Sequence, residues 1–309
     1  TKGYELVLGW RDSFKLAGST FSYGITGTFS DYTAEYTKCD NPTGLIGDPY
    51  VGKKYGEIWG YKVDGLFRND KEAAEYASRI DLSTVASGYY TATGAYGKGV
   101  RGGDIKYLDL NGDNIVNGGK GTLDDPGDRR VIGNSSPRYQ YGASLNFSWY
   151  GFDVSVFMQG IGRLDWYPGA DNLRFWGPYC RPYATFVPKN FMSQVWSEEN
   201  PDAYFPRARA YTSLNSNSGT AYYTNDRYLQ NLAYCRLKNL TIGYTIPRRL
   251  TSKVGIKECR IYFSGENLAT WSALKSDFLD PEQAAADSDK KANVYPWCKT
   301  YSIGLNLTF

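Results

Sequence analysis

Long runs in which apolar and polar residues alternate constrain this chain more than any other feature of its sequence. Residues 138–149 are the clearest case: every odd position carries an apolar or aromatic side chain, and every even position carries glycine or a polar side chain. Because successive side chains of a β-strand point to opposite faces, this run predicts a strand with one apolar and one polar face. The Tyr150-Gly151 turn and a second alternating run at 152–159, with only Phe157 out of phase, predict a hairpin.

The same alternation runs to the last residue of the sequence. Its apolar positions are Tyr301, Ile303, Leu305, Leu307 and Phe309. Aromatic residues lie near both ends of several such runs, as in the two aromatic girdles of an outer-membrane β-barrel. An aromatic edge strand left unpaired would promote aggregation, so we expect this strand to close a barrel. A soluble β-sandwich or β-helix stays open as an alternative, because single strands of this kind occur in both.

Composition narrows the chemistry that the chain can perform. The absence of His excludes Ser-His-Asp and Cys-His catalysis and every His-ligated metal site, and we predict no catalytic residue. A net charge of +3 without a block of Lys and Arg gives no reason to expect nucleic acid as a partner. The five scattered cysteines indicate neither a zinc site nor a full disulfide framework. No apolar run reaches the roughly 18 residues that a transmembrane helix needs.

The lengths of the connections between alternating runs also favour a barrel. We predict seven spanning strands, at 4–11, 21–36, 138–149, 152–160, 228–246, 257–269 and 299–309. Outer-membrane barrels have short periplasmic turns and long outer loops. We therefore expect periplasmic turns at 12–20, 150–151 and 247–256 and outer loops at about 37–137, 161–227 and 270–298. This alternation requires that 57–67 does not span the membrane, and one short helix is expected nearby at 70–79.

Eight segments, taken in order, resemble the C-terminal third of the SusC/RagA group of TonB-dependent outer-membrane transporters. They are GYELVLGWRD, EIWGYKVDGLF, GDIKYLDLNGDNIVN, DPGDRRVIGNSSPRYQYG, GFDVSVFMQGIG, YLQNLAYCRLKNLTIGYTIP, FSGENLATW and YSIGLNLTF. The resemblance covers essentially the whole chain. It implies an all-β fold, the C-terminal portion of an antiparallel transmembrane barrel of about 22 strands. The plug domain and the first strands would then lie outside residues 1–309.

The resemblance also implies a function. It implies TonB-dependent active import of glycan or oligopeptide nutrients across the outer membrane of a Gram-negative bacterium, without enzyme activity. The implied partners are a SusD-like lipoprotein lid, the rest of the barrel and its plug, the TonB complex, outer-membrane lipid, and a small glycan or peptide substrate. The loops would be extracellular and the C-terminus periplasmic. A soluble secreted carbohydrate-binding or carbohydrate-cleaving β-protein and a passive porin remain the alternatives.

The second predicted outer loop is rich in aromatic residues and arginine. Flat aromatic faces stack on sugar rings, and Arg side chains bond hydroxyl groups. The same residue types also anchor protein interfaces or pack a loop internally. The candidate residues for contact with ligand or lid are Arg163, Trp166, Tyr167, Arg174, Trp176, Tyr179, Arg181 and Tyr183.

A possible calcium site lies in the first predicted outer loop. Asp109, Asn111 and Asp113 occupy the first, third and fifth places of a calcium-loop pattern, where short oxygen-bearing side chains converge on one cation. The later places fail, because Asn114 replaces the expected Gly and Lys120 replaces the bidentate Glu. A run of Asx turns, held by hydrogen bonds alone, explains the same residues.

Overall fold

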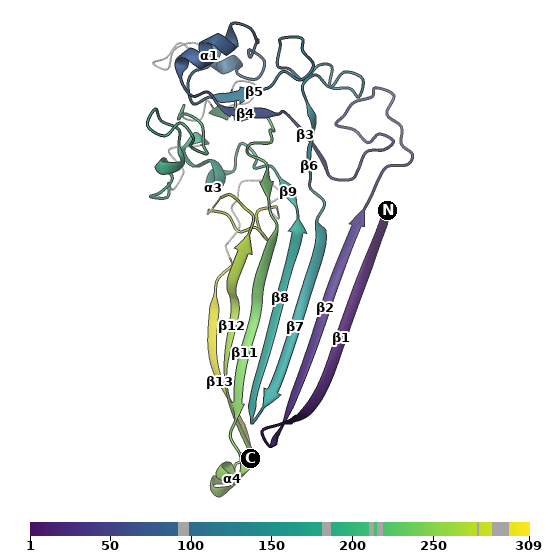
Figure 1. Cartoon of the computed structure of the whole chain (residues 1–309), viewed down its shortest axis with the longest axis vertical. Helices are drawn as coiled ribbons and strands as arrows, with labels where there is room; N and C mark the ends of the chain where they lie inside the picture. Colours follow the sequence, from purple (N-terminus) through teal and green to yellow (C-terminus); the bar gives the residue numbers. More distant parts are fainter. Residues whose placement is uncertain (92–98, 181–186, 210–212, 215–218, 277, 286–296) are drawn as a thin grey trace.

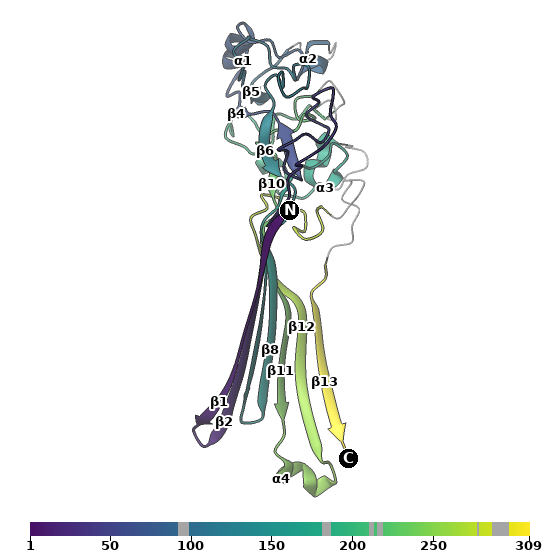
Figure 2. The same ribbon diagram turned by 90° about the vertical axis from the view of Figure 1, so that its right-hand side faces the viewer.

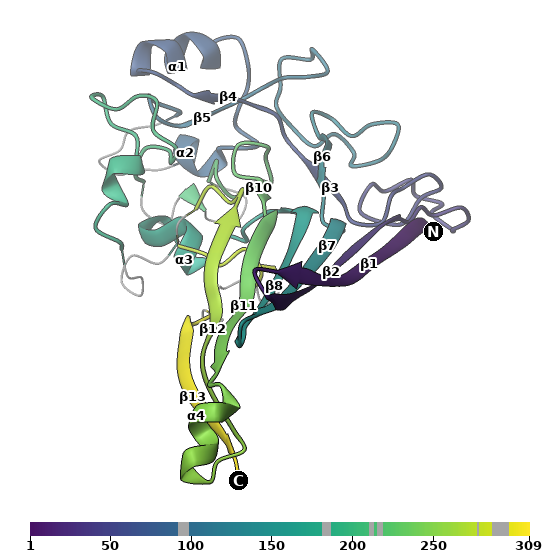
Figure 3. The same cartoon turned by 60° about the horizontal axis from the view of Figure 1, so that its bottom comes forward.

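The largest element of the fold is one antiparallel sheet of seven strands in chain order, which confirms the predicted all-β architecture. The computed structural model describes residues 1–91, 99–180, 187–209, 213–214, 219–276, 278–285 and 297–309. The strands of the sheet are β1 (Lys2–Leu16), β2 (Ser19–Thr33), β7 (Arg138–Trp149), β8 (Phe152–Arg163), β11 (Tyr234–Thr245), β12 (Glu258–Ser272) and β13 (Thr300–Thr308). The sheet is curved and not closed, with β1 and β13 as its two edges (Figure 3).

Two of the three connections at the lower end of the sheet in Figure 1 are tight two-residue turns. Ala17 and Gly18 have φ of 47° and 82°, and Tyr150 and Gly151 have φ of 48° and 83°. Positive φ at both central residues is the type I′ geometry, whose twist matches the twist of the flanking strands. The turn expected at 12–20 is therefore shorter than predicted, because β1 and β2 stay paired up to Leu16 and Ser19.

The third lower connection contains two short helices, α4 (Arg248–Thr251) and η4 (Ser252–Val254). The long connections leave the opposite end of the sheet, where the first two fold into a compact region (Figures 1 and 2). We call the described residues of 57–137 and 164–233 the cap. Among the described helices, none has the length and the apolar character needed to cross a membrane.

The cap contains small two-stranded sheets and short helices. Residues 57–67, which were expected to stay out of the main sheet, form two short strands of these small sheets. The strands are β3 (Glu57–Gly60) with β6 (Arg130–Asn134), β4 (Val63–Leu66) with β5 (Ile105–Tyr107), and β9 (Asp165–Trp166) with β10 (Gln230–Asn231). The helices are α1 (Asp70–Ala77), α2 (Ser87–Thr91), α3 (Leu173–Trp176), η1 (Gly177–Tyr179) and η2 (Met192–Gln194).

Helix α1 begins where the sequence predicts it. The side chain of Asn69 accepts a hydrogen bond from the backbone of Glu72, and the Glu72 carboxylate accepts one from the backbone of Arg68. The bond from Glu72 satisfies an N–H group that the helix start leaves without a partner, and the bond from Arg68 ties the residue before the N-cap to the first turn.

A single hydrophobic core joins the two long connections that make up the cap. Its buried members include Phe67 and Leu82 from the first connection and Phe175, Phe205 and Tyr228 from the second. Phe175 and Phe205 meet edge to face with ring centroids 5.5 Å apart, and Phe205 stacks on Tyr228 at 6.2 Å. Aromatic pairs of this kind stabilise a core beyond their buried area by about 0.5–1.5 kcal/mol each. The two connections therefore fold as one unit.

Candidate functional site

The register of the seven strands gives the sheet one apolar face. Trp10, Ile25, Leu145, Val156 and Leu240 oppose one another in turn across five strands, and directly opposed residues lie on the same face. The predicted closing strand continues this face, with Tyr301, Ile303, Leu305 and Leu307 all exposed and Ile303 84% exposed. Phe309 follows the end of β13 and is also exposed. A continuous exposed apolar surface of this kind marks a site of contact with a membrane or with another protein surface.

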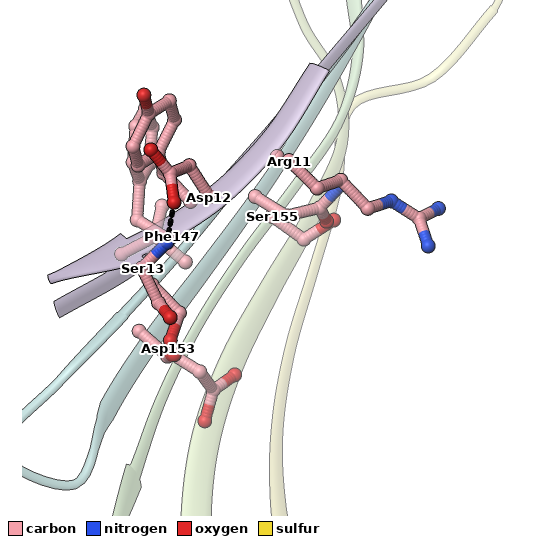
Figure 4. A pocket seen from close by; sticks show the side chains of 12 residues that line it. Arg11, Asp12, Ser13, Phe147, Asp153 and Ser155 are labelled. Atoms are coloured by element: carbon pink, nitrogen blue, oxygen red, sulfur yellow. Dashed lines mark hydrogen bonds between the residues drawn. The ribbon is translucent and has the colours of Figure 1, made fainter. Parts of the chain in front are cut away.

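The opposite face of the sheet is polar. Arg11 begins a row that continues through Gly24, Asn146, Ser155 and Thr241, each opposed to the next across the strands. Part of this face lines an open hollow, where Figure 4 shows the Arg11 side chain projecting away from the sheet. Polar and apolar residues thus alternate along the strands, with Phe157 as an exception on β8, as the sequence predicts for a barrel wall with a polar interior.

An ion pair crosses the polar face over a glycine. The Arg260 guanidinium on β12 donates to the Asp153 carboxylate on β8, with Nε 2.8 Å from Oδ1. Gly243 of β11 lies between these two strands, and a Cβ there would collide with both charged groups. Glycine at this position lets the ion pair pass close over the backbone.

The third long connection folds back onto the same polar face. Arg236 on β11 is 1% exposed, and its guanidinium pairs with Asp280 and with Glu282, at 2.7 Å from the latter. Lys238 also reaches Glu282 at 2.8 Å. Two basic residues of one strand thus hold two acidic residues of the connection. A buried Arg needs such partners, because an unpaired buried charge is strongly unfavourable.

Most of the aromatic residues predicted for ligand or lid contact lie in the interior of the cap. Trp176 is 0% exposed, Tyr179 1% and Trp166 8%. Tyr167 is partly buried, and its hydroxyl donates to the backbone oxygens of Ala221 and Tyr223. Trp176 and Tyr179 therefore pack the core of the cap, as the alternative for this loop proposed.

The described arginines of the same predicted set, Arg163 and Arg174, lie in different surroundings. Arg163 forms a 3.0 Å ion pair with Asp165. Arg174 is exposed on α3. Arg181 and Tyr183 lie outside the described residues. Among the described members of this set, the arginines and the aromatic residues do not share one surface, and ligand or lid contact stays a prediction for the set.

The oxygens of the predicted calcium loop accept hydrogen bonds from the backbone. The Asp109 carboxylate accepts from the N–H groups of Gly112 and Asn114, and Asp113 accepts from Ile115. The Asn111 side-chain oxygen accepts from the backbone of Asp113. Within the described residues, no three acidic or thiol side chains gather closely enough to hold a metal ion. Asx turns account for the pattern, and calcium binding stays a prediction.

A buried ion pair lies inside the cap, and no feature of the sequence predicts it. Arg209 donates to Asp104 at 2.6 Å, the side chains being 2% and 1% exposed, and the guanidinium lies 4.1 Å from the ring centre of Tyr89. Burial raises the pKa of Asp104 to about 6, although Arg209 opposes this rise. The pair joins the two long connections. Because its members are distant in sequence and belong to no motif, no sequence signal identifies them.

Comparison with known proteins places these features in a class. No protein-family model matches the chain. Its sequence is similar to two TonB-dependent receptors of Formosa agariphila. TonB-dependent receptor P26 is 28% identical over 67% of the chain and 20% of the receptor, and TonB-dependent receptor P3 is 25% identical over 100% of the chain and 28% of the receptor. The chain thus spans less than a third of the length of these curated relatives.

Solved structures show the same fold. The RagAB peptide transporter matches 99% of the chain with a TM-score of 0.60 and 17% identity, and 29% of that protein is covered. The RagAB peptide importer in its open-open state matches 99% of the chain with a TM-score of 0.55 and 18% identity, covering 28% of that chain. The fold is therefore that of a two-faced wall in a large β-barrel. Together with the sequence relatives, this confirms that the chain is SusC/RagA-like and related to TonB-dependent transporters.

Proposed function

We propose that this chain forms part of the wall and the outer loops of a TonB-dependent importer in a bacterial outer membrane. The observation that carries the proposal is the two-faced sheet: one face is continuously apolar across its strands, and the other is polar and carries paired charges. An apolar face suits lipid and a polar face suits a water-filled or plugged interior. In a soluble carbohydrate-binding β-protein, such an exposed apolar face would promote aggregation.

The cargo of the proposed importer is a small nutrient, either an oligopeptide or a glycan fragment. The names of the matched RagAB structures, a peptide transporter and a peptide importer, favour a peptide. The exposed part of the cap offers a surface for a SusD-like lipoprotein lid, as the family resemblance implies. The cap would face the medium, and the α4 end of the sheet would face the periplasm, because long loops of such barrels lie outside.

The import proposal is tested with the full-length parent gene in its native bacterium. Deleting the gene should reduce growth on peptide mixtures or glycan fragments as the limiting nutrient, and removing TonB should give the same defect. Membrane fractionation should place the protein in the outer membrane. Growth that is unaffected on every peptide and glycan mixture, or a protein recovered in the soluble fraction, would contradict the proposal.

The proposed orientation is tested by cysteine labelling in whole cells. Lys71 on α1 is 86% exposed, and Lys253 on η4 is exposed at the other end of the molecule. In a Cys298→Ser background, a membrane-impermeant maleimide should label Lys71→Cys in intact cells and Lys253→Cys only after permeabilisation. The opposite pattern would reverse the assigned orientation while leaving the barrel intact.

A further inference from the structure

A pocket in the cap combines aromatic rings with unpaired positive charge. It lies where β3, the glycine-rich segment 118–121, and the segments 166–170 and 222–224 of the second connection come together. The aromatic side chains of its wall include Trp59, Tyr61, Tyr167 and Tyr222, and its two charged side chains are Lys120 and Arg129.

The charge of this pocket has one sign. No Asp or Glu lines it, and within the described part of the chain neither Lys120 nor Arg129 forms an ion pair with a carboxylate. The nearby carboxylates of Asp125 and Asp128 bind backbone N–H groups instead, including that of Lys120 for Asp125 and that of Asn117 for Asp128. The exposed Asp124 carboxylate interacts with Lys120 through space from outside the pocket, without forming an ion pair with it. The walls therefore attract an anion, with no acidic side chain inside the pocket to compete for the cations.

The glycine-rich segment holds the guanidinium of Arg129 in place. Its Nη2 donates to the Gly118 oxygen at 2.8 Å, and its Nε has no hydrogen-bond partner in the described structure. A Cβ at Gly118 would lie 3.0 Å from the guanidinium carbon, and one at Gly121 would lie 2.9 Å from Nη2. Glycine at both positions leaves room for this close approach. Arg129 is thus fixed in position by its Nη2 group, with Nε buried, while its Nη1 group makes no hydrogen bond within the described structure.

The aromatic walls of the pocket are also fixed. The Tyr61 ring meets those of Tyr107 and Tyr223 edge to face, at centroid distances of 5.5 and 5.8 Å. The Tyr167 hydroxyl accepts a hydrogen bond from Asn225 at 3.0 Å. Rings that are already ordered lose little entropy when a ligand stacks on them.

We propose that this pocket binds the carboxylate of a ligand whose adjoining part packs on the aromatic walls. A planar guanidinium with free donors fits a carboxylate in a bidentate manner, and Lys120 adds a second charge. Two sources supply that chemistry, the C-terminal carboxylate of a peptide and the carboxylate of a uronic acid sugar. The inference rests on the proposed function, because it names the class of nutrient that the importer would receive at its cap.

The test measures binding to the purified full-length transporter in detergent by isothermal titration calorimetry. The probes are N-acetylated tetra-alanine and its C-terminal amide, and trigalacturonic acid and its methyl ester. At least one acid should bind more tightly than its uncharged counterpart, and its affinity should fall with added salt. The acid that binds identifies the source. Equal binding of acid and neutral counterpart in both pairs, or no binding of any probe, overturns the proposal.

Substitutions locate the binding. Arg129→Gln should weaken binding of the acid about 10- to 100-fold, as expected for losing hydrogen bonds between charged groups. Lys120→Gln should weaken it only about threefold, because an exposed charge contributes less. The matched control is Arg130→Gln, which removes the neighbouring positive charge outside the pocket and should leave affinity unchanged. Equal effects of Arg129→Gln and Arg130→Gln overturn the assignment.

Failure of the proposed carboxylate pocket and failure of the proposed import function would give different experimental results. If Arg129→Gln does not fold, Lys120→Gln and the acid-against-neutral comparison on the unchanged protein still decide the matter. Failure of the pocket alone leaves TonB-dependent uptake by the wild type intact. Failure of the proposed function would abolish that uptake while acid binding by the purified protein persists.

Discussion

Replacing Arg236 by Met should release the third long connection from the polar face of the sheet. Arg236 is 1% exposed and pairs with Asp280 and Glu282, and it also donates to Thr270 at 2.9 Å. Met fills a similar volume but leaves the two carboxylates facing each other, with only Lys238 as a counter-charge. Breaking a buried pair costs about 3–5 kcal/mol, and we take the lower end, about 3 kcal/mol. The reason is that Asp280 and Glu282 are 19% and 21% exposed, so that water reaches them.

The rate of amide hydrogen exchange at two residues of the third long connection measures whether the connection has been released. Gln283 and Ala284 both donate to the backbone oxygen of Asp280, at 3.2 and 2.9 Å. About 3 kcal/mol less protection corresponds to roughly 100-fold faster exchange. The full-length protein in detergent should show this increase in Arg236→Met. Adding Asp280→Asn should slow exchange again, because it removes the carboxylate that Lys238 does not pair with, while Glu282 keeps its ion pair with Lys238.

The control for this prediction is Arg260→Met. It breaks another ion pair of the same polar face, with Asp153, whose members are 22% and 36% exposed. Exchange at Gln283 and Ala284 should stay unchanged in this variant. If Arg236→Met speeds exchange there by less than about threefold, or no more than the control does, the ion cluster does not hold the connection in place.

Three further outcomes are expected. Trp176→Ala should lower the free energy of unfolding of the cap by about 3–5 kcal/mol, because this side chain is fully buried. Met192→Ala, at a side chain that is 60% exposed, should change it little. Denaturant titrations that show similar losses for both variants would refute the core assignment. Because burial raises the folded-state pKa of Asp104 from its ordinary 3.8 to about 6, the folded cap binds more protons in this window than the unfolded chain. Its stability should therefore fall as pH rises from 3.8 to about 6, and a melting profile equally steep in Asp104→Asn would contradict this. Gly243→Val should lower the temperature at which the folded band is lost in gel electrophoresis by more than Gly27→Val does. The reason is that a Cβ at Gly243 collides with the Arg260–Asp153 ion pair, whereas a Cβ at Gly27 meets nothing within 4 Å. Equal shifts would show that the ion pair tolerates a side chain at Gly243.

The strands of the sheet could be predicted because their pattern is local. Each strand shows one face to an apolar environment and one to a polar one, so the alternation is visible within about ten residues. The ends of β1 were missed for a physical reason. Asp12 interrupts the apolar positions, yet backbone pairing continues to Leu16 because the ladder does not depend on that side chain. Phe14 and Phe21, which oppose each other beyond it, carried the missed signal.

The interior of the cap could not be predicted in the same way. An aromatic residue in a loop has the same sequence signature whether it binds a ligand or packs a core. Trp176 is buried because Phe205 and Tyr228, from later parts of the chain, lie 6.4 and 5.1 Å away between ring centroids. The positions of Asp104 and Arg209 depend likewise on how two separate connections meet. Such long-range contacts leave no periodic pattern.

The shared core of the cap restricts how its two connections can diverge or be exchanged. Phe67 and Leu82 lie in the same buried cluster as Phe175 and Phe205, and Asp104 pairs across the same junction. A chimera that grafts only one connection from a relative would therefore inherit half of a core and half of an ion pair. Transplanting 57–137 together with 164–233 keeps both halves matched. Within this architecture the unit of inheritance for the outer surface is the pair of connections.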